Sequence, residues 1–254
     1  MTAPPPSATA STLQGRIVVI TRPAGTGSPL ARRVRRLGGV PLLLPGLSLR
    51  GAPGGEVAAA LREALADDVL AFTSPAAVRF AARLAPLRTK ALVFAVGQGT
   101  AQALRRHGVS AQAPAQRQDS EGLLAHPALA DLRGMRVALV GAPGGRGLLR
   151  EVLAARGARL REVHVYRRGA PRWNRRQLEA LMRLPADARV LLSSAEALEQ
   201  LRRGLPADAL ARLRAAVAVA SSERLAEAAC AAGFARVTLA ASAMGGDMLA
   251  AAAR

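Results

Sequence analysis

Hydroxyl side chains stand at two points of this sequence where an apolar run gives way to a helical pattern. In VLAFTSPAAVRFAARL these are Thr73 and Ser74, and in RVLLSSAEALEQLRR they are Ser193 and Ser194. Serine is a favoured N-cap residue, proline suits the first helical position, and Ser193 stands three residues before Glu196, as in a capping box. A helix N-terminus also presents unpaired N–H groups and a partial positive charge. The two junctions therefore predict helix caps that could also bind an anion such as a carboxylate.

The two junctions belong to two copies of one longer pattern of alternating strands and helices. The first copy begins RIVVI-TRPAGTGSP-LARRVRRLGG and contains LVFAVGQGTAQALRRHGV, and the second begins RVALV-GAPGGRG-LLREVLAARGA and contains AVAVASSERLAEAACAAGF. This alternation is typical of parallel sheets covered by helices on both faces. Ligands of such sheets bind beyond the carboxyl ends of the strands, where these serine and glycine junctions lie. The sequence thus predicts two α/β units with a ligand cleft between them.

The composition limits the classes of partner. The net charge is +19, and because Lys90 is the only lysine, nearly all of the positive charge is arginine spread along the chain. That charge suits an anionic partner, but aromatic residues are only 2% of the chain, which argues against stacking on single-stranded nucleic acid. Cys230 is the only cysteine, so no disulfide forms within the chain, and we expect its side chain to be buried. The three histidines show no metal-ligand spacing, and we expect neither a metal nor nucleic acid as a partner.

The N-terminal stretch MTAPPPSATASTL lacks both the basic and the apolar region of a signal peptide, and we expect a disordered tail over residues 1–13. No apolar run in the sequence is long enough to span a bilayer. We therefore expect a cytoplasmic protein without a membrane partner.

An ordered set of motifs resembles the uroporphyrinogen-III synthase family. The motifs are, in order, VITRP, FTSPAAV, AVGQGTAQAL, GGRGLLREVLAARG, VHVYRR, LLSSAEAL and VASSERLAEAACAAGF, and the resemblance covers roughly residues 14–253. No single motif is diagnostic, because Ser-Pro and Val-Gly turns are common, whereas the set in this order and spacing is specific. The second copy departs from the family pattern, with serines and Arg224 where Gly-x-x-Thr is commoner and Ala195 where the first copy has proline.

The resemblance implies an α/β fold with two flavodoxin-like parallel-sheet domains, joined by a two-stranded β-ladder, and a cleft between them. One domain is built from both ends of the chain, although the repeat alone would place the boundary near Gly134. The expected parts are the tail at 1–13, domain 1 at 14–45 and 169–254, domain 2 at 46–168, and ladder strands at about 42–49 and 162–168.

The resemblance also implies a function. Members of the family are lyases that close the linear tetrapyrrole hydroxymethylbilane into uroporphyrinogen III, with loss of water and inversion of the last pyrrole ring. Each ring of the substrate carries an acetate and a propionate, and neither a cofactor nor a metal is used. We expect a monomer that binds this small-molecule polycarboxylate, and transient contact with the preceding enzyme of the pathway stays open.

Tyr166 is the only tyrosine, and the resemblance makes it the candidate general acid that assists departure of the substrate's hydroxyl. The alternative for Tyr166 is a side chain that only covers a strand edge. For the serines the alternative is capping alone, and for the arginines it is a solvated position. The expected substrate-binding residues are Arg22, Thr73, Ser74, Gly97, Thr100, Ala101, Arg146, Ser193, Ser194, Ser221, Ser222 and Arg224.

Other functional classes stay open on the residues alone. GAPGGRG follows a strand and precedes Glu162 by about twenty residues, which resembles a dinucleotide-binding fingerprint without the G-x-G-x-x-G spacing. A two-domain binding protein for an anionic small molecule or nucleotide, without catalysis, is the main alternative to the synthase. A nucleic-acid binder is what the charge alone would suggest, and its binding would weaken steeply with salt.

Overall fold

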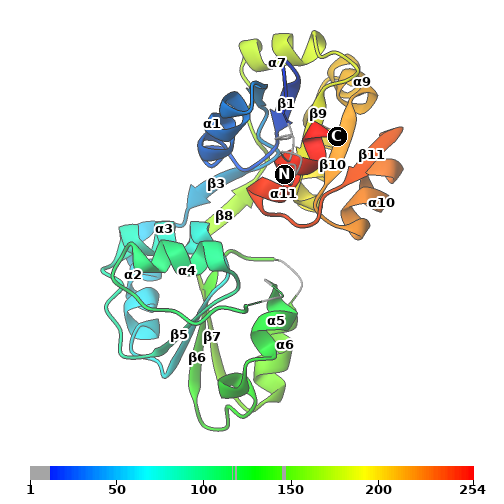
Figure 1. The fold of residues 1–254 in the computed structure, drawn as a ribbon. Coiled ribbons are helices and arrows are strands. Elements are labelled where there is room, and N and C mark those ends of the chain that lie inside the picture. The colour runs from blue at the N-terminus through cyan, green and yellow to red at the C-terminus, as the bar shows by residue number, and fades with distance from the viewer. Residues whose placement is uncertain (1–11, 116, 118, 145–146) are drawn as a thin grey trace, which may run out of the picture. The chain divides into compact units, whose positions relative to one another are not determined.

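The computed structural model describes residues 12–115, 117, 119–144 and 147–254, which fold into two units (Figure 1). Unit 1 runs up to Ser48 and resumes at Gly169, and unit 2 is Leu49–Arg168. Each unit has its own parallel sheet, so the predicted α/β class with two parallel sheets is confirmed.

Unit 1 is a parallel sheet covered by helices on both faces. Its elements are β1 (Ile17–Ile20), α1 (Ser28–Arg36), β2 (Val40–Leu43), α7 (Arg175–Met182), β9 (Arg189–Leu192), α8 (Ala195–Gly204), α9 (Ala207–Ala215), β10 (Val217–Ala220), α10 (Glu223–Ala231), β11 (Arg236–Leu239) and α11 (Gly245–Ala253). The strand order is β11-β10-β9-β1-β2. Of the inner strands, β1 (IVVI) and β10 (VAVA) are apolar throughout and β9 (RVLL) is apolar after Arg189, because both faces of the sheet are buried. One core cluster joins the sheet to α1 and α11, and a second joins it to α7, α8, α9 and α10.

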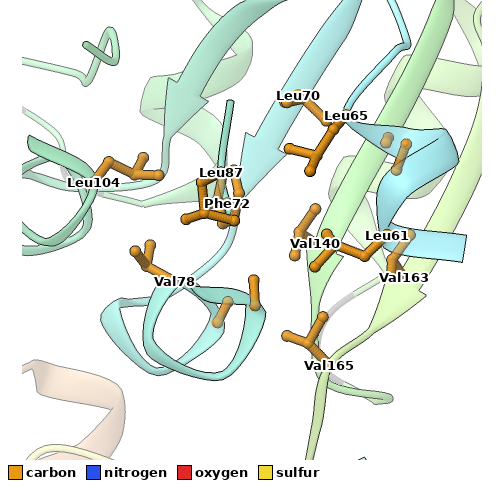
Figure 2. Packing of buried hydrophobic residues seen from close by; sticks show 14 of the residues in the cluster. Leu61, Leu65, Leu70, Phe72, Val78, Leu87, Leu104, Val140, Val163 and Val165 are labelled. Carbon is orange, nitrogen blue, oxygen red and sulfur yellow. The ribbon is translucent and has the colours of Figure 1, made fainter. Parts of the chain in front are cut away.

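Unit 2 repeats this plan with four parallel strands. Its elements are α2 (Gly54–Ala64), β4 (Val69–Phe72), α3 (Pro75–Leu84), β5 (Leu92–Ala95), α4 (Gln98–Arg105), α5 (Ser120–Leu124), the 3-10 turn η1 (Pro127–Leu129), β6 (Arg136–Gly141), α6 (Leu148–Ala155) and β7 (Arg159–His164). The strand order is β5-β4-β6-β7. One core cluster, shown in Figure 2, packs the sheet against α2, α3 and α4, and another packs it against α5, η1 and α6.

A two-stranded sheet, β3 (Ser48–Gly51) with β8 (Tyr166–Gly169), stands where the chain passes between the units. The strands run antiparallel, because Ala52 N–H bonds to Val165 O at one end and Ser48 Oγ–H bonds to Ala170 O at the other. The ladder expected at about 42–49 and 162–168 is therefore displaced along both strands.

The displacement has a local cause in each segment. Leu42 and Leu43 pair with β1 in the unit 1 sheet, and Pro45, which has no N–H to donate, follows before β3 begins. Glu162 and His164 likewise pair with β6 in unit 2, so the second ladder strand begins at Tyr166.

Two side chains differ from expectation in their burial. Leu13, assigned to the disordered tail, is completely buried beside α1 and α11, and its N–H bonds to Leu37 O at 2.8 Å, so the folded chain includes Leu13. Cys230 is exposed rather than buried, because the buried face of α10 carries Leu225 and Ala229, and Cys230 lies one position beyond that face.

Candidate functional site

A cavity of about 220 Å³ opens in unit 2 where β4, β6 and β7 end, the edge at which ligands of parallel sheets bind. We call it the unit-2 cavity. It brings together the sequence-predicted Thr73, Ser74 and Tyr166. The other lining residues are Val96, Ser120, Leu139, Gly141, Ala142, Gly144, Gly147, Leu148, Leu149, Arg150, Glu162, His164 and Arg168.

Ser74 and Tyr166 share a hydrogen bond in the wall of this cavity. Ser74 is the N-cap of α3, with Pro75 at the first helical position as predicted, and its Oγ accepts the Ala77 N–H at 3.1 Å. The same Oγ lies 3.1 Å from the Tyr166 hydroxyl oxygen. The Tyr166 ring is buried and stacks on Phe80 of α3, with the ring centres 5.3 Å apart and the planes 16° from parallel. The Ser74 side chain thus both caps the start of α3 and fixes the phenol at the cavity wall.

Thr73 is held by the strand next to it. Its Oγ1 donates to Val140 O at 3.3 Å, and Gly141 follows at the end of β6. A Cβ atom at Gly141 would lie closer than 3.0 Å to Thr73 Oγ1, a separation that real Cβ atoms essentially never show. Only glycine leaves room for Thr73 there, and the sequence did not single it out.

Charged groups of both signs line the rest of the unit-2 cavity. Arg150 and Arg168 supply cations, and Arg168 also donates to Pro143 O at 3.0 Å, which ties its position to the loop after β6. His164 Nε2 lies 3.7 Å from a Glu162 carboxylate oxygen. The arrangement suits a ligand that carries carboxylates and also offers hydrogen-bond donors.

The N-terminus of α3 offers fewer free backbone N–H groups to an anion than its sequence predicts. Pro75 has no N–H, Ser74 Oγ takes the Ala77 N–H, and Ser74 O takes the Val78 N–H. Within the described part of the chain, this leaves the Ala76 N–H as the first-turn donor open to a ligand. A carboxylate at this end would therefore need side-chain donors as well as the helix.

Three other predicted residues of unit 2 lie at the start of α4. Gly97 is its N-cap in extended conformation, and Thr100 and Ala101 are buried in its first turns. The wall of the unit-2 cavity takes Val96 from this segment and none of these three. A Cβ at Gly99 would lie 3.7 Å from Pro75, so the start of α4 approaches the start of α3.

The predicted residues of unit 1 follow the ends of β1, β9 and β10, at one edge of the sheet. Arg22 donates to Ala243 O at 3.3 Å, and its pKa is lowered by burial and then by the charge of Arg33. Ser221 precedes Ser222, which is the N-cap of α10 and makes no side-chain cap bond. Arg224 lies in the first turn of α10.

The capping box expected at Ser193 is wrong. Ser194 is the N-cap of α8, and its Oγ accepts the Ala197 N–H at 3.2 Å, because β9 ends at Leu192 and Ser193 is still a connecting residue. Arg146, the remaining predicted residue, lies outside the described residues.

Sequence reasoning missed several residues of the unit-2 cavity. Gly141, Arg150 and Arg168 lie within the quoted motifs GAPGGRG, GGRGLLREVLAARG and VHVYRR, but nothing in those motifs distinguished them from their neighbours. Glu162 and His164 did carry a signal. They lie two positions apart on β7, and side chains two positions apart share a face of a strand. Extending that alternation to the predicted Tyr166 would have placed all three on one wall.

Among the described residues, no cluster of three or more His, Cys, Asp or Glu side chains is placed to hold a metal ion. Across the same residues, none of the helices combines the length and the apolar character needed to cross a membrane.

Comparison with known proteins identifies a matching family model and similar proteins. The family model described as uroporphyrinogen-III synthase HemD matches residues 28–250. The uroporphyrinogen-III synthase of Escherichia coli is 33% identical over 74% of this chain and 80% of its own length, and that of Salmonella typhimurium is 31% identical over 72% and 78%.

Solved structures agree at the level of the fold. A mutant uroporphyrinogen III synthase from Thermus thermophilus superposes with a TM-score of 0.60 at 24% identity, over 92% of this chain and 96% of that one. The corresponding protein of Helicobacter pylori gives a TM-score of 0.60 at 14% identity, again over 92% and 96%.

Proposed function

Because the chain belongs to the uroporphyrinogen-III synthase family, we propose that it catalyses cyclisation of hydroxymethylbilane to uroporphyrinogen III. In this reaction water is lost and the last pyrrole ring is inverted, which makes the protein a cyclising lyase of tetrapyrrole synthesis. The observation that carries the proposal is the unit-2 cavity. A buried phenol, Arg150 and Arg168 line this cavity together at the edge of a parallel sheet where ligands bind.

We assign Tyr166 the role of general acid. The terminal hydroxyl of the substrate leaves only if its oxygen gains a proton, and Tyr166 is the phenol that the unit-2 cavity holds, fixed by Ser74 and by the Phe80 stack. Holding the chain ends of the tetrapyrrole together supplies a large part of the rate, because it converts ring closure into a reaction between oriented partners.

Carboxylate recognition is assigned to the cations and hydroxyls around these groups. Arg150 and Arg168 bind acetate or propionate groups in the unit-2 cavity, and Thr73 adds a hydroxyl there. Arg22 and the strand-end serines of unit 1, which lie at the same kind of sheet edge, offer a second set of donors. The start of α4 contributes through packing beside the cavity, with Gly97 at its N-cap.

Isomer analysis tests the proposal. Hydroxymethylbilane also cyclises spontaneously in water, without ring inversion, to the type I isomer. The purified protein, treated with a chelator and supplied with no cofactor, is expected to divert the substrate to the type III isomer, measured by chromatography of the oxidised products. A product mixture no richer in type III than the protein-free control would refute the synthase and favour binding without catalysis.

A further inference from the structure

We infer that Ser74 is a positioning residue for Tyr166: its hydroxyl donates to the phenol oxygen, directs the phenol proton into the unit-2 cavity and stabilises the phenolate that proton transfer leaves. The inference rests on the proposed function, in which Tyr166 is the acid. It goes beyond that function by giving Ser74 a part in the chemistry besides its cap on α3.

The hydrogen-bond capacity of Ser74 supports this direction of donation. A serine hydroxyl has one proton and two lone pairs. One lone pair accepts the Ala77 N–H at 3.1 Å, which fixes Oγ at the start of α3. The proton is then available to the Tyr166 oxygen, 3.1 Å away, and with that contact both the serine donor and one acceptor site are satisfied. The phenol proton is left for a third group, and both residues line the cavity where that group would bind.

The stack on Phe80 fixes the ring of Tyr166, the hydrogen-bond partner of Ser74. Ring centres 5.3 Å apart in nearly parallel planes prevent the Tyr166 ring from turning out of the wall. Phe80 lies on the same helix that Ser74 begins, and the guanidinium groups of Arg79 and Arg83 lie 5.0 and 5.7 Å from the centre of its ring. The helix therefore sets the plane of the phenol through Phe80 and the position of its oxygen through Ser74.

The step balances without any added reagent. The bond between the terminal carbon and its hydroxyl oxygen breaks, the oxygen keeps the electron pair, takes the phenol proton and leaves as water. The positive charge stays on the terminal carbon and is delocalised into its pyrrole ring, while the negative charge develops on Tyr166 Oη. A hydrogen bond from Ser74 to that oxygen strengthens as the charge grows, which lowers the barrier. The ring proton released after the new carbon–carbon bond forms restores the phenol.

Unit 1 supplies a matched control for the capping role. Asn174 begins α7 (Arg175–Met182) as Ser74 begins α3, and its Oδ1 accepts the Gln177 N–H at 2.9 Å. No tyrosine is available to it, since Tyr166 is the only one in the chain. Asn174→Ala removes a comparable cap and leaves the phenol contact intact.

The kinetic test compares these variants in formation of the type III isomer. Ser74→Ala is expected to lower kcat roughly tenfold or more, the usual effect of losing a hydrogen bond to a charged group, with a smaller change in KM. Ser74→Thr, which keeps both the hydroxyl and the cap, is expected to retain most of the rate, and Asn174→Ala is expected to stay within about twofold of wild type. In a Tyr166→Phe background Ser74→Ala is expected to change kcat less than about twofold, because its partner is gone. Equal effects of Ser74→Ala with and without Tyr166 would overturn the inference.

A spectroscopic test needs no activity. Tyr166 is the only tyrosine, so the tyrosine doublet in the ultraviolet resonance Raman spectrum reports on this phenol alone, and its intensity ratio distinguishes a donating from an accepting hydroxyl. The accepting signature is expected in wild type and Asn174→Ala and is expected to be lost in Ser74→Ala. A ratio unchanged by Ser74→Ala would refute the contact whatever the enzyme does. A wild-type protein that forms no excess of type III would instead refute the proposed function, and the catalytic role of Ser74 with it.

Discussion

Gly141→Ala tests whether the close approach of β6 to Thr73 shapes the unit-2 cavity. The added Cβ would lie inside 3.0 Å of Thr73 Oγ1, whereas ordinary contacts begin at 3.4 Å. Thr73 must then move by several tenths of an ångström or more and give up its hydrogen bond to Val140 O.

The size of the effect follows from these two losses. Overpacking a well-filled site costs about 1–3 kcal/mol, and the lost hydrogen bond adds about 1 kcal/mol. We expect Gly141→Ala to lower the free energy of unfolding by about 2–4 kcal/mol. The wall beside Ser74 moves as well, and because a displacement of about 1 Å can cost a hundredfold in rate, turnover is expected to fall more than binding.

Urea denaturation measures the stability, and the isomer assay measures the rate. Gly55→Ala is the matched control, because Gly55 lies in α2 with no atom within 4 Å of the added Cβ, and there alanine is expected to stabilise by roughly 0.5–1 kcal/mol. Thr73→Ala should relieve the clash, so the double variant Gly141→Ala/Thr73→Ala should be more stable than the sum of the two single effects. Strict additivity, or wild-type stability of Gly141→Ala, would refute the reasoning.

Three further predictions concern the acid, a buried arginine and an exposed carboxylate. Tyr166→Phe should lower kcat about a hundredfold without abolishing formation of type III, and an unchanged kcat at saturating substrate would remove Tyr166 from the mechanism. Arg189→Met should lower the urea-measured stability by about 1–3 kcal/mol, because buried Arg189 donates to two backbone carbonyls, whereas exposed Arg212→Met should change it little. The hydrogen bond from Arg202 is the main cause that lowers the pKa of Glu199 to about 2. The contribution of this ion pair to the stability of the fold is therefore present at neutral pH and is lost as the pH falls toward 2. Carboxyl NMR titration of wild type and Arg202→Gln checks this, and an ordinary midpoint for Glu199 in wild type would contradict it.

The local features of this fold could be predicted where one segment determines them. The apolar run of β4 and the Ser-Pro step after it specify a buried strand and a capped helix, and Ser74 and Pro75 occupy those positions. The order of such segments also specified the two parallel sheets. At the second junction the same reasoning placed the cap one residue too early. Ser193 and Ser194 have the same N-cap propensity, and only the position at which β9 ends decides between them.

Features that depend on two distant segments could not be predicted in the same way. Gly141 is required by Thr73, which is remote in the sequence but directly follows the neighbouring strand β4. The displacement of the ladder has the same origin, because pairing of β2 with β1 and of β7 with β6 uses residues that are just as extended as those of the ladder. Strand propensity describes one chain segment and contains no information on its partner.

The two copies of the fold explain why the phenol of the candidate site belongs to unit 2. After β7, the Val165 N–H bonds to Gly141 O at the end of β6, and after β2 the Leu44 N–H bonds to Ile20 O at the end of β1. The next residue is Tyr166 in unit 2 and Pro45 in unit 1.

In unit 1 the chain then turns against the first helix after the serine junction. A Cβ at Gly46 would lie 2.6 Å from the Ala197 side chain, so this copy brings its backbone against the start of α8, where unit 2 places an aromatic ring beside α3. Both copies keep the capping serine, but only in unit 2 does the segment beside it carry a hydroxyl that the serine can bind. Pro45→Tyr should therefore fail to give Ser194 a phenol partner, because the ring would need the space in which the chain at Gly46 packs on Ala197. A crystal structure of the variant with a hydrogen bond between Ser194 and the new phenol would contradict this explanation.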